Sequence, residues 1–225
     1  THIHPPGATR SEKYKTTKES QKKINLRKVI TELTILMNAN FKPGDYHLVL
    51  TYEKDKRADT VDKAKKDRTM FLDRLRRKAK KEDAICKYIL VTEVGVRGAL
   101  HHHMVVNKMP VEWLRQAWQY GRISIHPLDD TGQYSGLAEY FAKYITRFRE
   151  LGGKGRAWTR SKNLFRPETK KKIIRNRGYF REVPGEKKGY WLDKRTVYAG
   201  ISEYTGWNFL RYILVRNDGR RGSPA

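Results

Sequence analysis

The stretch Ala99-Leu100-His101-His102-His103-Met104-Val105-Val106-Asn107 carries the strongest structural signal in the chain. Hydrophobic and β-branched residues continue beyond the three histidines until Asn107 ends the run, a composition that predicts a short β-strand. Successive side chains of a strand point to opposite faces. We therefore expect His101 and His103 on one face, about 7 Å apart along the strand, and His102 on the other.

A second strand-like run, Tyr88-Ile89-Leu90-Val91-Thr92-Glu93, lies just before this stretch. Gly95 and Gly98 separate the two runs, and glycine is common in turns. If the runs pair as an antiparallel hairpin, Glu93 at the end of the first lies opposite His101 at the start of the second. Two imidazoles and one carboxylate on one face form the donor set of an open divalent-metal site. The alternative is a polar surface strand whose histidines are only solvated.

The balance of charges predicts a negatively charged partner. The chain has 225 residues, with 49 Lys and Arg against 24 Asp and Glu, a formal net charge of +25. This length fits one large domain with its own hydrophobic core. The positive charge favours binding to nucleic acid phosphates, and the aromatic residues, 11% of the chain, suit stacking of single-stranded bases. No hydrophobic run is long enough to span a bilayer, so we expect no membrane partner.

Cysteine content and glycine spacing narrow the setting and the chemistry. Cys86 is the single cysteine, so no internal disulfide can form, as in proteins of a reducing cytoplasm. We expect a cytoplasmic location, the host cell cytoplasm if the protein is viral. Gly152-Gly153-Lys154-Gly155 lacks the spacing of a phosphate-binding loop. We therefore expect no nucleotide cofactor and no nucleotide-hydrolysing motor.

Hydrophobic periodicity predicts helices and strands along most of the chain. We expect helices over residues 17–40, 60–83, 110–121 and 136–150, strands over 47–52, 88–93, 99–107 and 122–126, and a hairpin over 196–216. Irregular structure and short strands are expected over 156–195. The predicted organisation is a flexible basic tail (1–16), one domain (17–216) with a motif core (41–170) and a basic C-terminal extension (156–216), and a disordered tail (217–225).

Basic residues gather in two of these regions. In the helix over 60–83 we expect phosphate contacts from Arg68, Arg74, Arg77 and Lys78. In the C-terminal extension, where basic and aromatic residues alternate, we expect DNA contacts from Arg156, Arg160, Lys170 and Lys171. For the helix, the alternative is an ordinary solvated face.

The helix over 136–150 has two stripes at a spacing of about 100° per residue. Hydrophobic residues form the stripe that should face the core: Leu137, Phe141, Ile145 and Phe148. Tyr140, Tyr144 and Arg147 form an adjacent row, with Lys143 beside it. Considered alone, the tyrosines are better explained as the rim of the hydrophobic stripe.

A metal site nearby changes the interpretation of these tyrosines. A tyrosine hydroxyl can attack as a nucleophile once its proton is removed. A metal with open positions can polarise a phosphodiester, and Lys143 or Arg147 would stabilise phenolate and the charge on the phosphorus oxygens. The sequence therefore contains every group that tyrosine-mediated phosphodiester transfer requires. Because the covalent link conserves the energy of the bond, strands can be rejoined without ATP.

These residues resemble the HUH endonucleases, and specifically the rolling-circle replication initiators. The first family motif is an apolar strand that ends in Thr-Tyr, and Leu48-Val49-Leu50-Thr51-Tyr52 is similar to it. The second is a His-hydrophobe-His strand with an upstream glutamate, matched by Glu93, His101 and His103. By this resemblance these three residues hold the metal ion, Mn²⁺ or Mg²⁺.

The third family motif is Tyr-x-x-x-Tyr on a helix with a nearby lysine, matched by Tyr140, Lys143 and Tyr144. The two tyrosines resemble the phi-X gene A type and the filamentous-phage gene II type of initiator. Two positions differ from the family pattern. His102 replaces the hydrophobic residue between the metal histidines, although strand geometry leaves its two neighbours as the pair. Arg147 stands where a further lysine is expected, and the resemblance covers roughly residues 41–170.

The resemblance implies an α+β fold, the RRM-like HUH fold, with helices packed on a central antiparallel sheet of about five strands. It also implies a replication initiator nickase that cuts single-stranded or hairpin origin DNA through Tyr140 or Tyr144. The products are a 5′-phosphotyrosine and a 3′-hydroxyl that primes synthesis. A host helicase and polymerase would act in trans.

Two other functions use the same residues. A transposase or relaxase of a mobile element shares this chemistry and differs in its DNA substrate. A non-catalytic nucleic-acid-binding protein would use the metal only for stability. Metal-dependent nicking of a labelled single strand separates an enzyme from such a binding protein.

Overall fold

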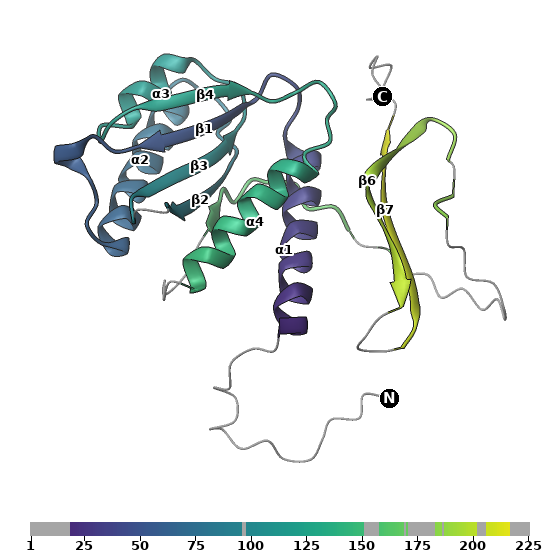
Figure 1. Ribbon diagram of the computed structural model, residues 1–225. Coiled ribbons are helices and arrows are strands. Elements are labelled where there is room, and N and C mark those ends of the chain that lie inside the picture. The colour runs from purple at the N-terminus through teal and green to yellow at the C-terminus, as the bar shows by residue number, and fades with distance from the viewer. Residues whose placement is uncertain are drawn as a thin grey trace.

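The computed structural model describes residues 19–95, 98–150, 158–168, 170, 183–185, 187–201 and 206–216. Within them, helices pack on both faces of a five-stranded antiparallel sheet of order β4-β1-β3-β2-β5 (Figure 1). The strands are β1 Tyr46–Thr51, β2 Tyr88–Val94, β3 Leu100–Val106, β4 Ile123–Pro127 and β5 Trp158–Arg160. The predicted α+β fold class is confirmed.

Strand β3 is the middle strand of this sheet, between β1 and β2. Gly98 lies in the turn that connects β2 to β3 and has a φ of 74°, a conformation that glycine adopts without strain. The Gly95 N–H closes the turn by donating to the Ala99 carbonyl at 2.7 Å. The resulting register places Glu93 opposite His101, as the sequence predicts.

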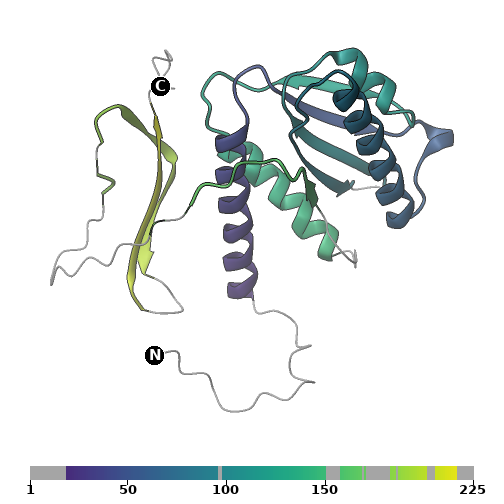
Figure 2. The same cartoon turned by 180° about the vertical axis from the view of Figure 1, so that it is seen from behind.

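Two pairs of helices cover the two faces of the sheet (Figures 1 and 2). Helices α1 (Glu19–Asn40) and α4 (Ser135–Glu150) pack on one face, and α2 (Val61–Lys81) and α3 (Val111–Ala117) pack on the other. A short 3-10 helix, η2 (Lys54–Lys56), follows β1. The Thr60 side chain caps α2 by accepting from the Lys63 N–H at 3.3 Å, which explains why the helix begins there.

Each face of the sheet has its own hydrophobic core. Leu50 and Met104 pack toward α2, where Phe71 is fully buried. Val105, on the other face, packs toward α4, where Phe141 is fully buried. Each buried side chain of this size contributes about 1.5 to 3 kcal/mol relative to an exposed one. The two cores fix α4 against the sheet face that carries His101 and His103.

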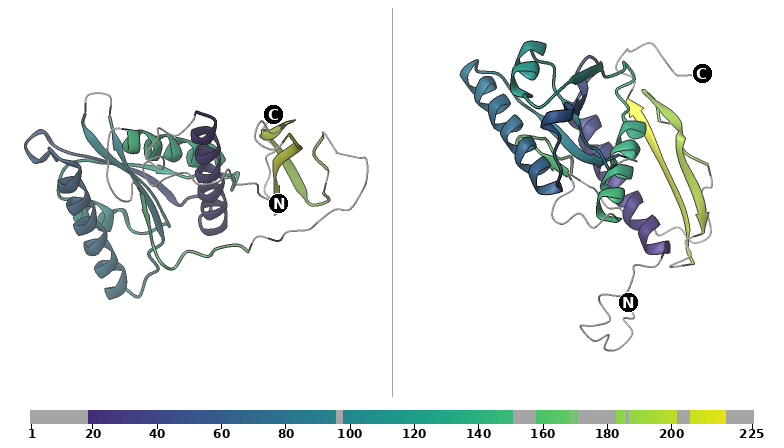
Figure 3. Two further views of the ribbon diagram at one scale, coloured as in Figure 1. Left: turned by 90° about the horizontal axis from the view of Figure 1, so that it is seen from below. Right: turned by 60° about the vertical axis from the view of Figure 1, so that its left-hand side comes forward.

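A second, two-stranded sheet consists of β6 (Tyr190–Ile201) and β7 (Asn208–Arg216). This hairpin lies beside α1, on the side away from the main sheet (Figures 1 and 3). Its first strand begins at Tyr190, before the predicted start at residue 196. The prediction missed this part because the register shifts between Asp193 and Tyr198, which interrupts strict alternation.

Parts of the predicted domain organisation lie outside the described residues. These parts are the tails over 1–16 and 217–225 and the stretch 171–182 of the basic extension. In the described residues, no helix is both long enough and hydrophobic enough to cross a membrane.

Candidate active site

The middle strand β3 presents its histidines to two different environments. His101 lies opposite Glu93 of β2, and His103 lies opposite Val91, two residues further along the hairpin. Val91 belongs to the core under α1 and α4. Glu93, His101 and His103 therefore share that face, and His102 points toward α2 and α3.

The Glu93 carboxylate joins the two histidines of its face. Glu93 Oε2 is hydrogen-bonded to His103 Nε2 at 2.8 Å and lies 3.9 Å from His101 Nδ1. Burial lowers the pKa of His103, and the hydrogen bond with Glu93 opposes this shift. His101 keeps about a third of its side chain exposed. The site is therefore closed on the His103 side and open to solvent on the His101 side.

The donor atoms of this face suit a divalent cation. Among the described residues, no three His, Cys, Asp or Glu side chains form a ready-made metal cluster, because Glu93 and His103 bond directly to each other. His103 Nδ1 is buried and has no hydrogen-bond partner in the described part of the chain. Two imidazoles and a carboxylate are ligands of Mn²⁺, and the carboxylate is also a ligand of Mg²⁺. A bound cation would replace the hydrogen bond between Glu93 and His103.

Both tyrosines of α4 lie against His103. The Tyr144 ring stacks on the imidazole, with centroids 4.7 Å apart and an interplanar angle of 15°, and Tyr140 meets the same ring edge-on at 5.3 Å. The two tyrosine rings are 4.5 Å apart, as expected for residues one helical turn apart. Tyr140 is 40% exposed and Tyr144 is half-buried. The structure thus brings both tyrosines and all three expected ligands to one face.

The surroundings of Tyr144 keep its hydroxyl neutral. Burial raises the pKa of Tyr144 above its ordinary value, and hydrogen bonding to Tyr140 and the charge of Glu93 raise it further. A positive charge placed beside Glu93 would oppose these effects. The chemistry of this tyrosine is therefore coupled to the charge on Glu93.

The two expected cations of α4 lie one turn from the tyrosines. Lys143 is largely exposed, and its Nζ lies 3.3 Å from a carboxylate oxygen of Glu139. Arg147 is half-buried. Lys143 is three residues from Tyr140, and Arg147 is three residues from Tyr144, a spacing that makes side chains neighbours on a helix.

His47 is a site residue that the sequence interpretation missed. Its ring stacks on His103 with centroids 5.7 Å apart and meets the Tyr140 ring edge-on at 6.3 Å. Burial, helped by neighbouring His103 and His126, lowers the pKa of His47 to about 4. His47 therefore supports His103 and Tyr140 as a neutral ring. The clue was available, because strand alternation gives His47 the same face as Val49 and Thr51 of β1.

On the opposite face, His102 is completely buried in a chain of polar side chains. Thr92 Oγ1 lies 3.0 Å from His102 Nδ1, and the Tyr52 hydroxyl lies 3.1 Å from His102 Nε2. Arg68 donates to Thr92 Oγ1 at 3.0 Å. Burial and the nearby Arg68 charge lower the pKa of His102 to about 3. His102 is therefore a neutral structural residue.

The donors in this chain determine its direction. Thr92 accepts from Arg68, which has no acceptor atoms, so the Thr92 hydroxyl hydrogen is left for His102 Nδ1. His102 Nε2 then carries the ring hydrogen and donates to Tyr52. The Tyr52 hydrogen is left for Asp67, whose charge adds to burial in raising the pKa of Tyr52. The chain ties β1, β2 and β3 together directly behind the metal-ligand face.

The position of Arg68 corrects one prediction. Only 8% of Arg68 is exposed, and its guanidinium is committed to Thr92. The expected phosphate contact of Arg68 is therefore wrong. Helical periodicity assigned it to the basic face of α2, but burial beside Thr92 and His102 gives it an internal role.

The other expected DNA-binding residues have different surroundings. Arg74 and Lys78 of α2 and Arg160 of β5 make internal contacts, with the Ala117 carbonyl (3.2 Å), Glu82 (2.8 Å) and Glu32 (2.9 Å), respectively. Arg77 and Lys170 are exposed, and Arg156 and Lys171 lie outside the described residues. Because α2 covers the face opposite the tyrosines, its cations are separated from the site by the sheet.

The segment of the chain that matches a known family runs through this site. Residues 45–148 match a family model described as replication-associated protein, of the ORF2 and gene II protein type. The match covers a little under half of the chain and includes β1, the β2–β3 hairpin and both tyrosines. It supports a role in the initiation of replication. A search of curated proteins and a search of solved structures each found no match.

Proposed function

We propose that the chain is a replication initiator nickase that cuts and rejoins single-stranded origin DNA through a 5′-phosphotyrosine. The observation that carries this proposal is the packing of Tyr144 and Tyr140 against His103, the imidazole that is hydrogen-bonded to Glu93. A nucleophile of this kind beside an open set of metal ligands suits attack on a phosphodiester.

In the proposed reaction, the phenolic oxygen of Tyr140 or Tyr144 forms a bond to the phosphorus, and the bond from phosphorus to the 3′-oxygen breaks. The phenolic proton leaves, and the departing 3′-oxygen gains a proton to become a free 3′-hydroxyl. That hydroxyl primes synthesis, and the later attack of a 3′-hydroxyl on a phosphotyrosine rejoins a strand. With two tyrosines in ring contact, one can hold a DNA end while the other attacks.

Glu93, His101 and His103 would hold Mn²⁺ or Mg²⁺. When bound, such an ion supplies Lewis acidity toward a phosphate oxygen. The protein groups bind and orient the substrate: His47 and His103 fix the tyrosine rings, and Lys143 and Arg147 neutralise phosphate charge. The proposed partners are single-stranded or hairpin origin DNA and a helicase and polymerase supplied by the host.

A covalent-adduct assay tests this proposal without knowledge of the origin sequence. The probe is a random-sequence single-stranded oligonucleotide library with a 3′-fluorophore, incubated with the full chain and Mn²⁺. Attack that leaves a 5′-phosphotyrosine keeps the labelled 3′-fragment on the protein in a denaturing gel. Sequencing of the trapped DNA would then identify the cut site.

The matched variants are the double substitution Tyr140→Phe with Tyr144→Phe, and Tyr120→Phe as a control outside the site. We expect the adduct to disappear in the double variant and in EDTA, and to persist in the control. An adduct that survives the double substitution would exclude these tyrosines as the nucleophiles.

A further inference from the structure

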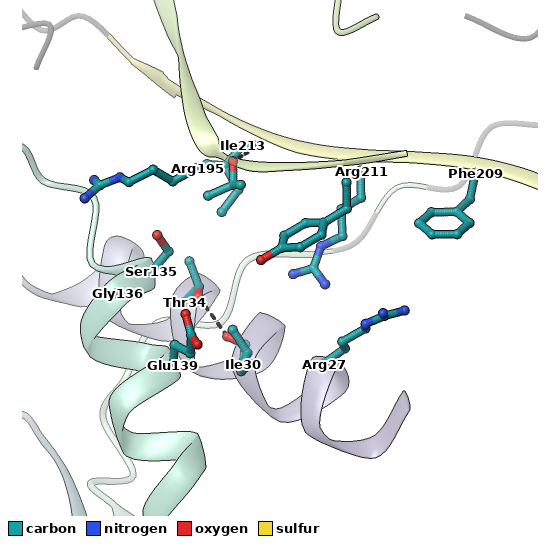
Figure 4. Close-up of a pocket in the computed structure, with 12 residues that line it drawn as sticks. Arg27, Ile30, Thr34, Ser135, Gly136, Glu139, Arg195, Phe209, Arg211 and Ile213 are labelled. Carbon is teal, nitrogen blue, oxygen red and sulfur yellow. Dashed lines mark hydrogen bonds between the residues drawn. The ribbon is translucent and has the colours of Figure 1, made fainter. Parts of the chain in front are cut away.

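A cavity of about 370 Å³ lies between α1, the start of α4 and the β6–β7 hairpin (Figure 4). This volume is within the range of small-ligand sites. The hairpin strands lie outside the segment matched by the family model, which ends at residue 148. The cavity is thus separate from the metal-ligand face and depends on a part of the chain to which the proposed mechanism gives no role.

The walls of the cavity carry an excess of positive charge. Arg27, Arg195 and Arg211 line it, against the single carboxylate of Glu139, which is already paired with Lys143. Neither Arg27 nor Arg211 has an ion-pair or hydrogen-bond partner for its guanidinium in the described part of the chain. Figure 4 shows Arg211 extending from the hairpin toward the helices. Unpaired guanidinium groups in a hollow surface are suited to phosphate.

Aromatic rings stand beside these arginines. Phe209 and Tyr198 line the same cavity from β7 and β6, and Tyr198 is 53% exposed. Exposed rings next to cations form the combination that binds single strands, because a base stacks on the ring while the cation holds the backbone. The lining therefore favours a nucleotide over a simple anion.

The hairpin is held in place by Asp193 of β6, which is 2% exposed. Its carboxylate accepts from Gln133 Nε2 at 3.1 Å and from Ser135 Oγ at 3.5 Å, just before and at the start of α4. Gln133 in turn accepts from Asn38 Nδ2 of α1 at 2.6 Å. One polar chain thus connects the three elements that form the cavity.

The cavity lies next to the proposed nucleophiles. Glu139 lines it and directly precedes Tyr140, and Gly136, also in the lining, is one helical turn earlier, about 6 Å along the axis. A strand that contacts Tyr140 can therefore continue along α4 into the cavity within a few nucleotides.

We propose that this cavity binds one nucleotide of the single-stranded DNA that flanks the cleaved phosphate. Arg27 and Arg211 hold its phosphates, and Phe209 or Tyr198 stacks on its base. This inference rests on the proposed function for its choice of DNA, and it gives the C-terminal hairpin the task of guiding the strand toward α4.

Binding of fluorescent oligo(dT), measured by anisotropy in EDTA at several salt concentrations, tests the proposal. The double variant Arg27→Ala with Arg211→Ala should bind at least about 10-fold more weakly, with a shallower salt dependence, because about two phosphate contacts are lost. Phe209→Leu should weaken binding about 5- to 10-fold and leave the salt dependence unchanged, because stacking is lost. Arg115→Ala, an exposed arginine of α3 on the other side of the sheet, is the matched control and should change binding less than about twofold.

Two results would overturn the proposal. In one, the cavity variants bind oligo(dT) as well as Arg115→Ala does, with the same thermal stability. In the other, they lose binding of free thymidine monophosphate but keep oligo(dT) binding, which would make the cavity a small-molecule site.

The outcome is independent of the nickase chemistry. If wild-type protein forms no adduct but the cavity variants lose oligo(dT) binding, the DNA-binding cavity stands and the nickase proposal fails. If the adduct forms and the cavity variants bind normally, the nickase proposal stands and the cavity proposal fails.

Discussion

His102 and His103 are adjacent in the chain, yet the sheet gives them opposite tasks. Both ring nitrogens of His102 have hydroxyl partners, Thr92 and Tyr52, and the ring is completely buried. His103 shares one nitrogen with Glu93 and leaves the other without a hydrogen-bond partner in the described residues. A satisfied imidazole stabilises, whereas one with free capacity can bind. The face of the strand, more than the residue type, decides which histidine is available for chemistry.

The largest predicted difference between the two faces is in activity. Replacing His103 by Ala should lower the yield of covalent adduct at least about 100-fold, because a metal ligand is worth several kcal/mol in the transition state. His126→Gln, at an exposed histidine on edge strand β4, is the control and should stay within a few-fold of wild type. Equal adduct yields from both variants would remove His103 from the metal site.

The next effect is on stability and belongs to the other face. His102→Phe leaves the hydroxyls of Thr92 and Tyr52 without their partner in a buried environment. We expect a loss of about 2 to 4 kcal/mol in the free energy of unfolding, measured by urea denaturation. A loss below about 0.5 kcal/mol, the scale of an ordinary surface substitution, would show that the polar chain contributes little.

The same residue makes stability depend on pH. The folded pKa of His102 is lowered to about 3, while the unfolded chain takes up its proton near pH 6.5. Stability is therefore fully present above pH 6.5 and falls as the pH drops from 6.5 toward 3. In EDTA, His102 alone should cost roughly 2 kcal/mol between pH 6.5 and pH 5. Unfolding curves of His102→Phe at both pH values should show this part of the change removed; an identical pH dependence would contradict the assignment.

The smallest predicted effect concerns the end of the polar chain. Tyr52→Phe removes one hydrogen bond to His102 and keeps the ring that packs against Trp118. The free energy of unfolding should fall by about 1 kcal/mol. Adduct yield should change far less than in His103→Ala, because Tyr52 lies on the other face. A loss of activity as large as that of His103→Ala would mean that the two faces are not separate.

The features that follow from local order were predictable from the sequence. Alternation alone separated His102 from His101 and His103, and the glycines of the β2–β3 turn set the register that brings Glu93 opposite His101. The hydrophobic stripe of α4 likewise indicated which side of the helix meets the sheet.

Features that depend on distant segments were not predictable. Arg68 is buried because Thr92, from another element, accepts its hydrogen bond. His47 joins the site only because β1 pairs with β3, next to His103. The cavity requires the β6–β7 hairpin to dock through Asp193, a contact between parts of the chain that no local pattern connects.

The most direct test of the account is the paramagnetic effect of Mn²⁺ on the tyrosine ring signals of ¹³C-labelled protein. A central ion held by Glu93, His101 and His103 should broaden the rings of Tyr140 and Tyr144 more strongly than that of Tyr212 on the β6–β7 hairpin, and His103→Ala should abolish the difference. Broadening of Tyr140 and Tyr144 that is no stronger than that of Tyr212 would place the ion away from the tyrosines and contradict the account.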